Sequence, residues 1–569
     1  MTLPEQWLPE SLRSLRGYSR ADFNADLLAG FTVGLVALPL AMAFAIASGV
    51  PPQAGLYTAI VAGGLISALG GSRLQIGGPT GAFVVIVAGI VAQFGISGLA
   101  LVTVMAGIML VVMGLTGLGA AVKFIPRPVT IGFTNGIALL IASTQIKDFF
   151  GLRTGDVPSA FLPRMKLLLS KFDTVHWPAL AVGAGTMCVI LFWPRLTKRV
   201  PGSVIALLGF TGLVAGFGIP LETVGSKFGG IPTTLPRLSI PTFHMTQVVP
   251  LLPSAVTVAL LAAIESLLSA VVADSMSGYR HNSNVELVAQ GVANIASPLF
   301  GGIPATGAIA RTATNIRSGA RTPIAGIVHA LTLLLIVLVA GSMARFIPLA
   351  TLSGVLFIVA YNMGEWREIG TILRLSKADI AVWATTFALT VVADLTVAVE
   401  VGMVLAALLY IYRVSQTTTV VPVTEEYIRD GRAHILQDKQ LPWYVTILRI
   451  HGPFLFGTTE KLAEATAKLE TFAPIVILRL RNMTALDATG IHALETFSER
   501  LHKAGRTLLV CGARNQPARL LERTDFVECI GRENVLPHVQ AALDRARELS
   551  EAFEGTGPEI AKDLATKSL

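Results

Sequence analysis

The sequence is poor in charged residues and in cysteine. Asp, Glu, Lys and Arg make up 14% of its 569 residues, whereas a soluble domain carries about 25%. The low share argues against a chain that is soluble throughout. The three cysteines, Cys188, Cys511 and Cys529, show neither metal-ligand nor disulfide spacing, so neither a zinc site nor a disulfide framework is expected.

Several functional patterns are also missing. The loops and the C-terminal part contain no Ser-His-Asp, P-loop or metal-ligand pattern, and the nine His are scattered. We therefore expect no enzyme, no metal and no cofactor. The net charge of +8 comes mostly from Lys and Arg in short loops between apolar runs, which is a membrane-topology signal and not a nucleic-acid footprint.

What the sequence does have is long apolar runs. From Leu27 to about Val414 they follow one another with lengths of roughly 16–22 residues, enough or nearly enough to cross a ~30 Å hydrocarbon core. Beyond Val414, short apolar strands and amphipathic helix predict a smaller soluble α/β domain. The first part is predicted to be an all-α polytopic membrane domain with about fourteen transmembrane segments, at 27–48, 53–70, 79–95, 98–118, 127–146, 177–194, 202–220, 253–273, 285–299, 305–319, 323–342, 349–363, 378–393 and 396–413.

The topology follows from this count. An even number of spans returns the C-terminal domain to the side of the N-terminus, and the basic residues Arg13, Arg16 and Arg20 predict that this side is cytoplasmic. The N-terminal segment is polar and lacks the apolar core of a cleavable signal peptide. The expected organisation is a cytoplasmic segment (1–26), a transmembrane domain (27–414), a cytoplasmic domain (415–548) and a disordered tail (549–569).

Two stretches of the membrane domain resemble each other. "IGGPTGAFVV" (76–85) and "FGGIPATGAIAR" (300–311) each contain a Gly pair, a Pro and then Thr-Gly-Ala. They precede the third and the tenth predicted spans, which are equivalent places if the spans form two sets of seven. An odd number of spans per set requires the second set to be inverted, and matching interruptions in two halves indicate a transporter site. The alternative is coincidence, because Gly, Ala and Thr are common in membrane helices.

A helix that begins within the membrane leaves its first N–H groups unpaired, and the helix dipole adds positive charge there. Two such starts that face each other make an anion site from the backbone. Pro suits a helix start, Gly allows a ligand to approach, and Thr can cap or donate a hydroxyl. The residues in these roles are Pro79, Thr80 and Gly81 in the first break and Pro304, Thr306 and Gly307 in the second.

Arg311 and Glu265 are the two ionisable residues inside predicted spans to which we assign a function, because charge within a span is costly and suggests function. Arg311 has the sign that an anion requires, although it could instead snorkel or pair with an acid. Glu265 has Ser269 on the same helix face, and a carboxyl group there could carry a proton and couple anion movement to a proton gradient. The alternative for Glu265 is a structural acid. A polar stripe on the ninth span could line either a domain interface or a pathway; its members are Asn282, Asn284, Glu286, Gln290 and Asn294.

The chain resembles the SulP family, solute carrier family 26, of anion transporters. The resemblance rests on residues 26–63 ("DLLAGFTVGLVALPLAMAF…"), on "GPTGAF", and on residues 265–326, which include "VELVAQGVANIASPLFGGIPATGAIAR". It implies fourteen spans in a seven-plus-seven inverted repeat, as in uracil permeases. It also implies a core domain (spans 1–4 and 8–11) that moves like an elevator against a gate domain (spans 5–7 and 12–14).

The resemblance also implies a site. The substrate would be bound by Phe44, by Thr80, Gly81 and Ala82, and by Gly307, Ala308, Ile309 and Arg311, with Glu265 and Ser269 in proton coupling. In sodium-driven bicarbonate members the matching places hold Asp, Thr and Thr, where this chain has Glu265, Ser269 and Ile309. The loss of oxygen ligands favours protons over sodium without excluding sodium.

Among members, the chain looks most like bacterial C4-dicarboxylate transporters, and sulfate permeases are near relatives. The soluble tail resembles a STAS domain through "HGPFLFGTTEKL" and "VILRLRNMTALDATGIHALE", where Asp487 and Gly490 form the turn into a helix. Ala488 stands where regulated STAS proteins have a phosphorylated Ser. We thus expect a proton-coupled symporter of a C4-dicarboxylate such as fumarate, in a bacterial cytoplasmic membrane and as a homodimer. The alternative is a sulfate, bicarbonate or chloride transporter or exchanger.

Overall fold

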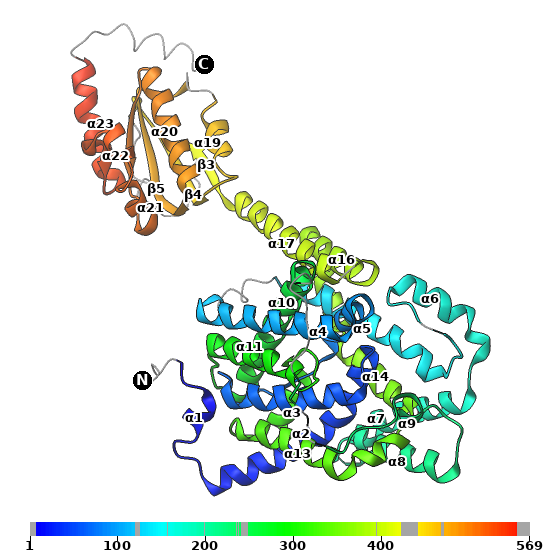
Figure 1. Cartoon of the computed structure of the whole chain (residues 1–569). Helices are drawn as coiled ribbons and strands as arrows, with labels where there is room; N and C mark the ends of the chain where they lie inside the picture. The colour runs from blue at the N-terminus through cyan, green and yellow to red at the C-terminus, as the bar shows by residue number, and fades with distance from the viewer. Residues whose placement is uncertain are drawn as a thin grey trace. The chain divides into compact units, whose positions relative to one another are not determined.

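The structure is a computed structural model, and it divides into two units, Met1–Ala406 and Ala407–Leu569, which are described separately (Figure 1). It describes residues 7–119, 126–155, 157–197, 200–234, 236, 238–239, 248–393, 395–422, 442–467 and 471–554.

The first unit is helical apart from one short pair of strands. Its elements are α1 (Glu10–Ser14), α2 (Arg20–Ala47), α3 (Pro52–Leu69), β1 (Gly77–Gly78), η2 (Gly81–Phe83), α4 (Val84–Leu115), α5 (Arg127–Phe150), α6 (Phe161–Ser170), η4 (Phe172–Thr174), α7 (Trp177–Leu196), α8 (Gly202–Phe217), α9 (Val224–Phe228), α10 (Val248–Ser277), α11 (Ser283–Leu299), β2 (Thr306–Gly307), α12 (Ile309–Arg317), α13 (Ile324–Ala340), η6 (Gly341–Phe346), α14 (Leu349–Met363), α15 (Trp366–Ile372), α16 (Lys377–Val392) and the start of α17 (Leu395–Thr417).

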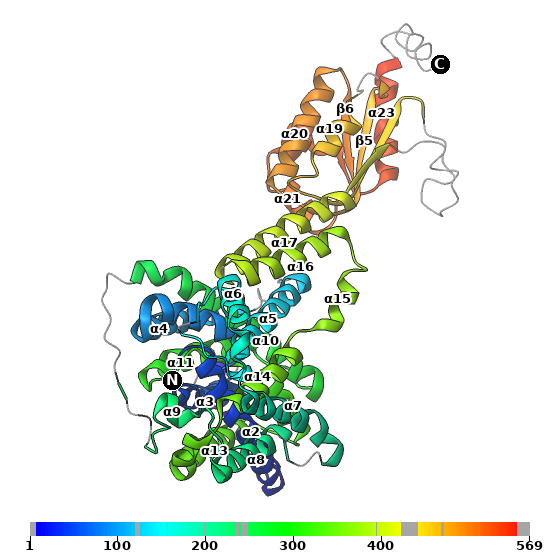
Figure 2. The ribbon, with the colours of Figure 1, turned by 90° about the vertical axis from the view of Figure 1, so that its right-hand side faces the viewer.

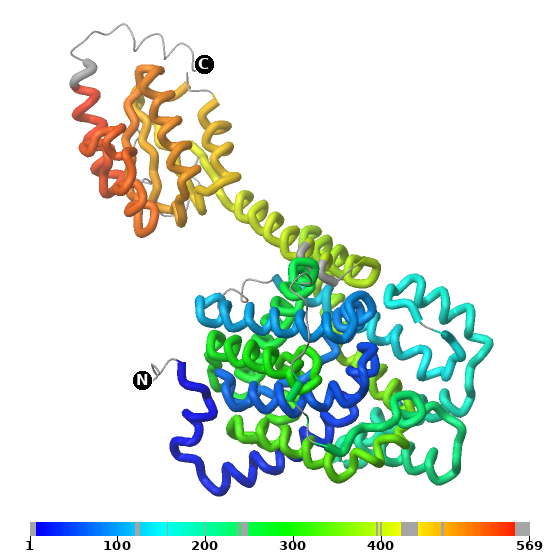
Figure 3. The backbone as a smooth tube through the Cα atoms, in the orientation of Figure 1, coloured from blue at the N-terminus to red at the C-terminus, as the bar shows by residue number. Residues whose placement is uncertain are grey.

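Two groups of helices pack within this unit. Helices from distant parts of the sequence interleave in the first group: α11 packs on α3 and α4, α13 packs on α2 and α3, and α10 packs on α4 and α12 (Figure 3). In the second group α5 packs against α14 and α16, and α7 packs against α8 and α14. Small residues permit the close crossings. A Cβ atom on Gly291 would lie 2.6 Å from the carbonyl oxygen of Gly107, so α11 and α4 meet backbone to backbone.

Helices lie in each range expected for a span. Gly95, with φ 70°, divides α4 into two helical stretches at the expected boundary between the third and fourth spans. The tenth range differs in detail. In the range 305–319 only Ile309–Arg317 is helical, because Thr306 and Gly307 are extended. Within the described residues, seven helices are long and apolar enough by themselves to cross a membrane.

The second unit is built on a five-stranded sheet in the order β3-β4-β5-β6-β7. Only the β3–β4 pairing is antiparallel; β4 to β7 are parallel. The sheet lies between α20 on one face and α23 on the other (Figure 2). Its elements are β3 (Thr419–Pro422), β4 (Val445–Phe454), α19 (Glu460–Ala465), β5 (Ile475–Leu486), α20 (Ala488–Lys503), β6 (Thr507–Cys511), α21 (Asn515–Leu521), α22 (Phe526–Ile530), η8 (Arg532–Asn534), β7 (Val535–Leu536) and α23 (Val539–Glu554).

The strand, turn and helix expected around Asp487 are present. The Asp487 side chain caps α20 by accepting a hydrogen bond from the Gly490 N–H at 2.8 Å. At the other end of the unit, α23 continues to Glu554, so the first residues of the expected disordered tail are helical. The rest of that tail, 555–569, lies outside the described residues.

Candidate functional site

The two interrupted segments lie next to each other. Strands β1 and β2 pair antiparallel, with Gly77 opposite Gly307 and Gly78 opposite Thr306. The pairing extends by one hydrogen bond, since the Ala308 N–H donates to the Ile76 carbonyl at 2.8 Å. Because the strands are antiparallel, the chain leaves this crossing in opposite directions, into η2 and α4 on one side and into α12 on the other. The near-repeat in the sequence is therefore a pair in space.

Neither threonine of the repeat lies within a helix. Thr80 is extended (φ −126°, ψ 160°) and precedes η2, and its buried hydroxyl has no hydrogen-bond partner among the described residues. Thr306 lies in β2, and its hydroxyl is 2.7 Å from that of Ser266 on α10. Ser266 Oγ also accepts from the Gly307 N–H at 3.1 Å. The second break is thus fixed by α10, whereas the hydroxyl of the first is left unengaged.

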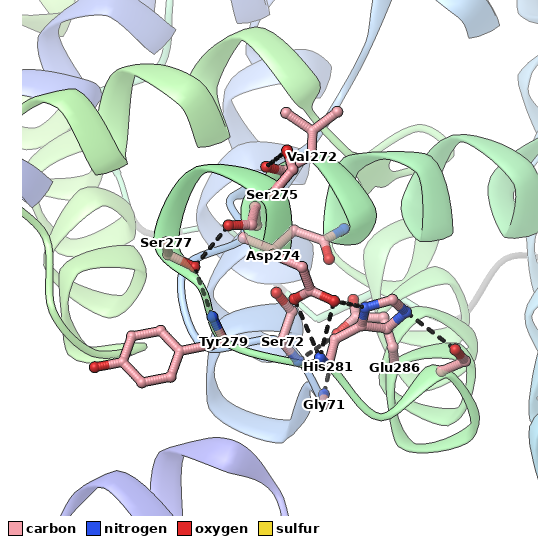
Figure 4. Close-up of polar contacts among 12 residues, drawn as sticks. Gly71, Ser72, Val272, Asp274, Ser275, Ser277, Tyr279, His281 and Glu286 are labelled. Atoms are coloured by element: carbon pink, nitrogen blue, oxygen red, sulfur yellow. Dashed lines mark hydrogen bonds and ion pairs between the residues drawn. The ribbon is translucent and has the colours of Figure 1, made fainter.

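The polar stripe of α11 holds both breaks. Asn294 brackets Ala305, donating to its carbonyl at 2.8 Å and accepting from its N–H at 2.9 Å. Glu286, fully buried, accepts from the N–H groups of Gly71 and Ser72, which lead into β1, at 3.0 and 3.1 Å (Figure 4). Non-helical backbone in an apolar interior must find partners within the protein. Glu286 and Asn294 supply such partners.

Arg311 is the charged residue at the crossing. It lies on α12, is 2% exposed, and donates from Nη2 to the carbonyl of Pro79 in the first break. Its Nη1 has no hydrogen-bond partner, and no described acid forms an ion pair with it. The side chain therefore neither snorkels nor pairs with an acid in this structure. A buried, charged N–H group without an acceptor is costly, so Nη1 of Arg311 is suited to an anionic ligand.

Glu265 and Ser269 lie on α10 but have different surroundings. Glu265 is half-buried and takes part in no hydrogen bond or ion pair found among the described residues. The hydroxyl of Ser269 is fully buried and lies 3.1 Å from that of Thr312 on α12. Ser269 therefore links α10 to α12 through Thr312.

The remaining predicted site residues surround the same crossing. Phe44, from α2, is 4% exposed, and its ring lies 3.4 Å from where a Cβ on Gly81 would be. Ala82 is fully buried in η2. At the second break Ala308 is 6% exposed, whereas Ile309, the first residue of α12, is 38% exposed. The start of α12 is thus open on the side of Ile309.

Sequence reasoning missed several residues that position the breaks. Gln75 donates to the Ser266 carbonyl at 3.1 Å, Thr312 accepts from the Ile76 N–H at 3.0 Å, and Asn315 donates to the Leu74 carbonyl at 2.9 Å. One signal was available. Thr312 and Asn315 are polar residues three apart on a short helix whose Arg311 we had already singled out, and such spacing indicates one polar face.

His281 joins Asp274 and Ser283 in a local hydrogen-bonded chain, which does not alter the expectation that the protein is not an enzyme. His281 Nδ1 is 2.7 Å from Asp274 Oδ2, and His281 Nε2 is 3.0 Å from Ser283 Oγ. Asp274 also accepts from the His281 N–H, so it fixes the loop between α10 and α11 (Figure 4). The three residues span only ten positions, and they meet because the loop folds back on itself.

The comparisons with known proteins match this architecture. The sequence profile described as the sulfate permease family matches residues 23–386, and that of the STAS domain matches residues 438–542. The chain belongs to the sulfate permease family. The resemblance seen in the sequence is thereby confirmed at the level of the family and of its C-terminal STAS domain.

Relatives and solved structures agree along most of the chain. YvdB of Bacillus subtilis, whose name proposes sulfate transport, is 42% identical over 92% of this chain and 98% of its own. The bicarbonate transporter BicA of Picosynechococcus sp. is 31% identical over 96% of this chain and 98% of its own. The structure of SLC26A9 superposes with a TM-score of 0.86 at 18% identity, over 97% of this chain and 94% of that one; at this identity it shows the fold.

These findings define the class of the protein. It is a mostly helical, multi-pass membrane protein with a STAS domain, from a family of anion transporters and not of enzymes. The named relatives concern sulfate and bicarbonate, so the C4-dicarboxylate substrate stays a prediction.

Proposed function

We propose that the chain is a secondary active transporter that binds a small anion where its two broken helices meet. The observation that carries this proposal is the buried guanidinium of Arg311, which contacts Pro79 of the first break and has an unpaired Nη1. The first N–H groups of α12 and its dipole add positive character at the same place.

The site selects by charge before it selects by shape. A guanidinium offers planar, paired donors that suit a carboxylate or another oxyanion. A neutral ligand would leave the Arg311 charge buried and uncompensated, so it would bind much more weakly. Thr80 offers a hydroxyl that has no other described partner. Gly307, which we expected to admit the ligand, is instead packed against Gln75 and Ser266.

The substrate that we propose is a C4-dicarboxylate such as fumarate, on the basis of the family resemblance in residues 26–63. Sulfate and bicarbonate are the alternative, which the names of the relatives favour. All three are oxyanions, so Arg311 would contact any of them, and uptake must discriminate between them.

Glu265 is the proposed proton carrier. It is a carboxyl group on the helix that fixes the second break, one residue before Ser266, and no described cation neutralises it. Protonation of Glu265 would change the charge near the anion site by one unit. The affinity for the anion would then depend on whether Glu265 is protonated, which couples the two binding equilibria.

The proposed architecture is fourteen spans in two inverted sets of seven, with a core that moves like an elevator against a gate. The antiparallel pairing of β1 with β2 supports the inversion, because it relates equivalent places of the two sets. The two packing groups of helices support the division into core and gate. A homodimer in a bacterial cytoplasmic membrane, with both termini in the cytoplasm, completes the proposal from the resemblance and the charge rule.

The test is uptake of labelled fumarate, sulfate and bicarbonate into proteoliposomes, with and without an inward proton gradient. We expect one anion to be taken up in preference and its uptake to accelerate with the gradient. Glu265→Gln should abolish that acceleration, whereas Asp173→Asn, a matched change at an exposed acid, should preserve it. Gradient-driven uptake that survives unchanged in Glu265→Gln would refute the coupling role, and uptake of none of the three would refute the substrate class.

A further inference from the structure

On the face of the STAS sheet that packs against α23, the side chains of β5 change from apolar to basic. Side chains alternate between the two faces of a strand, and Ile475 and Ile477 are fully buried in the cluster that includes Val539 of α23. The next residues in the same phase are Arg479 and Arg481. Helix α23 begins only at Val539, so the basic stretch of β5 lies at the end of the sheet that the first turn of α23 reaches.

A cavity of about 500 Å³ lies at this point. It is bordered by the carboxyl ends of the parallel strands β6 and β7 and by the start of α23. The basic and imidazole side chains that line it are those of Arg479, Arg481, Arg514 and His538. Of the described residues that line it, none is acidic. Ligands of open α/β sheets bind at the carboxyl ends of the strands, and small-molecule sites have volumes of roughly 300–1,000 Å³.

Two of the arginines at this cavity have side chains that reach solvent. Arg481 and Arg514 are exposed, and neither forms a side-chain hydrogen bond or an ion pair that the described residues reveal. Gly512 lies beside Arg481, since a Cβ on Gly512 would lie 3.5 Å from that of Arg481.

The other described groups that line the cavity carry no negative charge. Burial raises the pKa of the Cys511 thiol to about 12, against a weaker opposing effect of Arg479, so the thiol stays neutral. The first turn of α23 contains no acid, and its dipole places further positive character at the rim. His538 Nδ1 accepts from the Ala541 N–H at 3.1 Å, which orients the ring at the entrance to the helix.

We propose that this cavity is a second anion site, independent of the membrane site, which binds a multiply charged oxyanion. The ligand chemistry is a phosphate or sulfate group held by the guanidinium groups of Arg481 and Arg514 with His538 at the rim. The source of that group is either a free inorganic anion or the phosphate end of a larger molecule such as a nucleotide, because the cavity has room for both.

The test uses the purified full-length protein in detergent and measures bound label by equilibrium dialysis. The probes are inorganic phosphate, sulfate and ATP. The double variant Arg481→Ala/Arg514→Ala should bind the preferred probe at least about tenfold more weakly at this site, because two charge-assisted contacts are lost. The matched control is Arg519→Ala/Arg523→Ala, which removes two arginines of the same domain that do not line the cavity.

Each outcome decides something. Weaker binding of phosphate or sulfate alone identifies a free oxyanion as ligand, and weaker binding of ATP alone identifies the phosphate end of a larger molecule. The variant Arg481→Lys/Arg514→Lys should keep much of the binding, which excludes a folding defect as the cause. Equal binding in wild type and in Arg481→Ala/Arg514→Ala overturns the proposal, and so does an equal loss in the control, which indicates a diffuse charge effect.

Discussion

The two breaks share a sequence pattern but differ in what holds them and in what they offer to a ligand. The first break, at Gly77–Thr80, carries no charge, and it leads through one turn of η2 into the long helix α4. The second break, at Thr306–Ala308, leads into the nine-residue helix α12, which carries Arg311. Ser266 and Asn294 fix the second break directly, whereas Glu286 holds the first only through Gly71 and Ser72.

This difference indicates a division of labour between two related halves. The second break supplies the charge and is rigidly mounted. The first break supplies the Pro79 carbonyl, which accepts a hydrogen bond from Arg311, and the Thr80 hydroxyl, which has no described partner. Gly81, which follows it, is surrounded by the ends of side chains. A repeat of sequence thus need not mean a repeat of role, because each half has different neighbours.

The largest effect is expected at Arg311. Arg311→Ala should reduce the uptake efficiency by at least about thirtyfold, because a desolvated charged contact contributes 2–5 kcal/mol. Arg311→Lys should recover part of the loss, since it keeps the charge without the paired donors. Initial rates in proteoliposomes measure both. Arg317→Ala, at the exposed far end of α12, is the control and should transport normally.

If Arg311→Ala transports as well as Arg317→Ala does, the second break does not supply the charge, and the proposed asymmetry is wrong.

A smaller but still large effect is expected at Gly78. Its φ is 147°, and a Cβ there would lie 2.6 Å from Arg311 Nη1, so Gly78→Ala strains the backbone and displaces the guanidinium. We expect about a tenfold loss of uptake efficiency with little change in the amount of folded protein. Gly81→Ala is the comparison, because its new Cβ would meet only side-chain atoms at 3.1–3.4 Å. A loss for Gly81→Ala as large as that for Gly78→Ala would show that crowding alone, without Arg311, explains both.

The smallest effects should separate the two threonines. Thr306→Val removes the partner of Ser266 and should lower the free energy of unfolding by about 1 kcal/mol. Thr80→Val removes a hydroxyl with no described partner, so it should leave thermal stability unchanged and raise the KM for uptake a few-fold, by roughly the energy of one hydrogen bond. Melting curves and uptake kinetics of both variants check this. The reverse pattern would exchange the roles of the two breaks.

The sequence permitted prediction of the breaks because Gly, Pro and Thr within apolar runs have local consequences. Arg311 could be located because it is a charge within a predicted span, and the turn at Asp487 because it lies between a predicted strand and a predicted helix. It could not reveal that β1 pairs with β2, since that contact joins Gly77 to Gly307 across more than two hundred residues. Nor could it assign Asn294 and Glu286, whose partners are backbone groups of other segments. Side chains that serve distant backbone carry no periodic signal.

The boundaries were harder to predict for a related reason. We expected the range 305–319 to be one span, yet its first residues are extended because Ser266 and the β1 strand take their hydrogen bonds. The hydrogen-bonded chain at His281 was not predicted, since only the folded loop brings Asp274 to the ring.

The most direct test of the account is a structure determined with a heavy-atom analogue of the transported anion, bromofumarate for fumarate or selenate for sulfate. We predict an anomalous peak within hydrogen-bonding reach of Arg311 and beside the start of α12, lost in Arg311→Ala. An anion found elsewhere in the membrane unit, with Arg311 paired to an acid of the protein, would contradict the central claim.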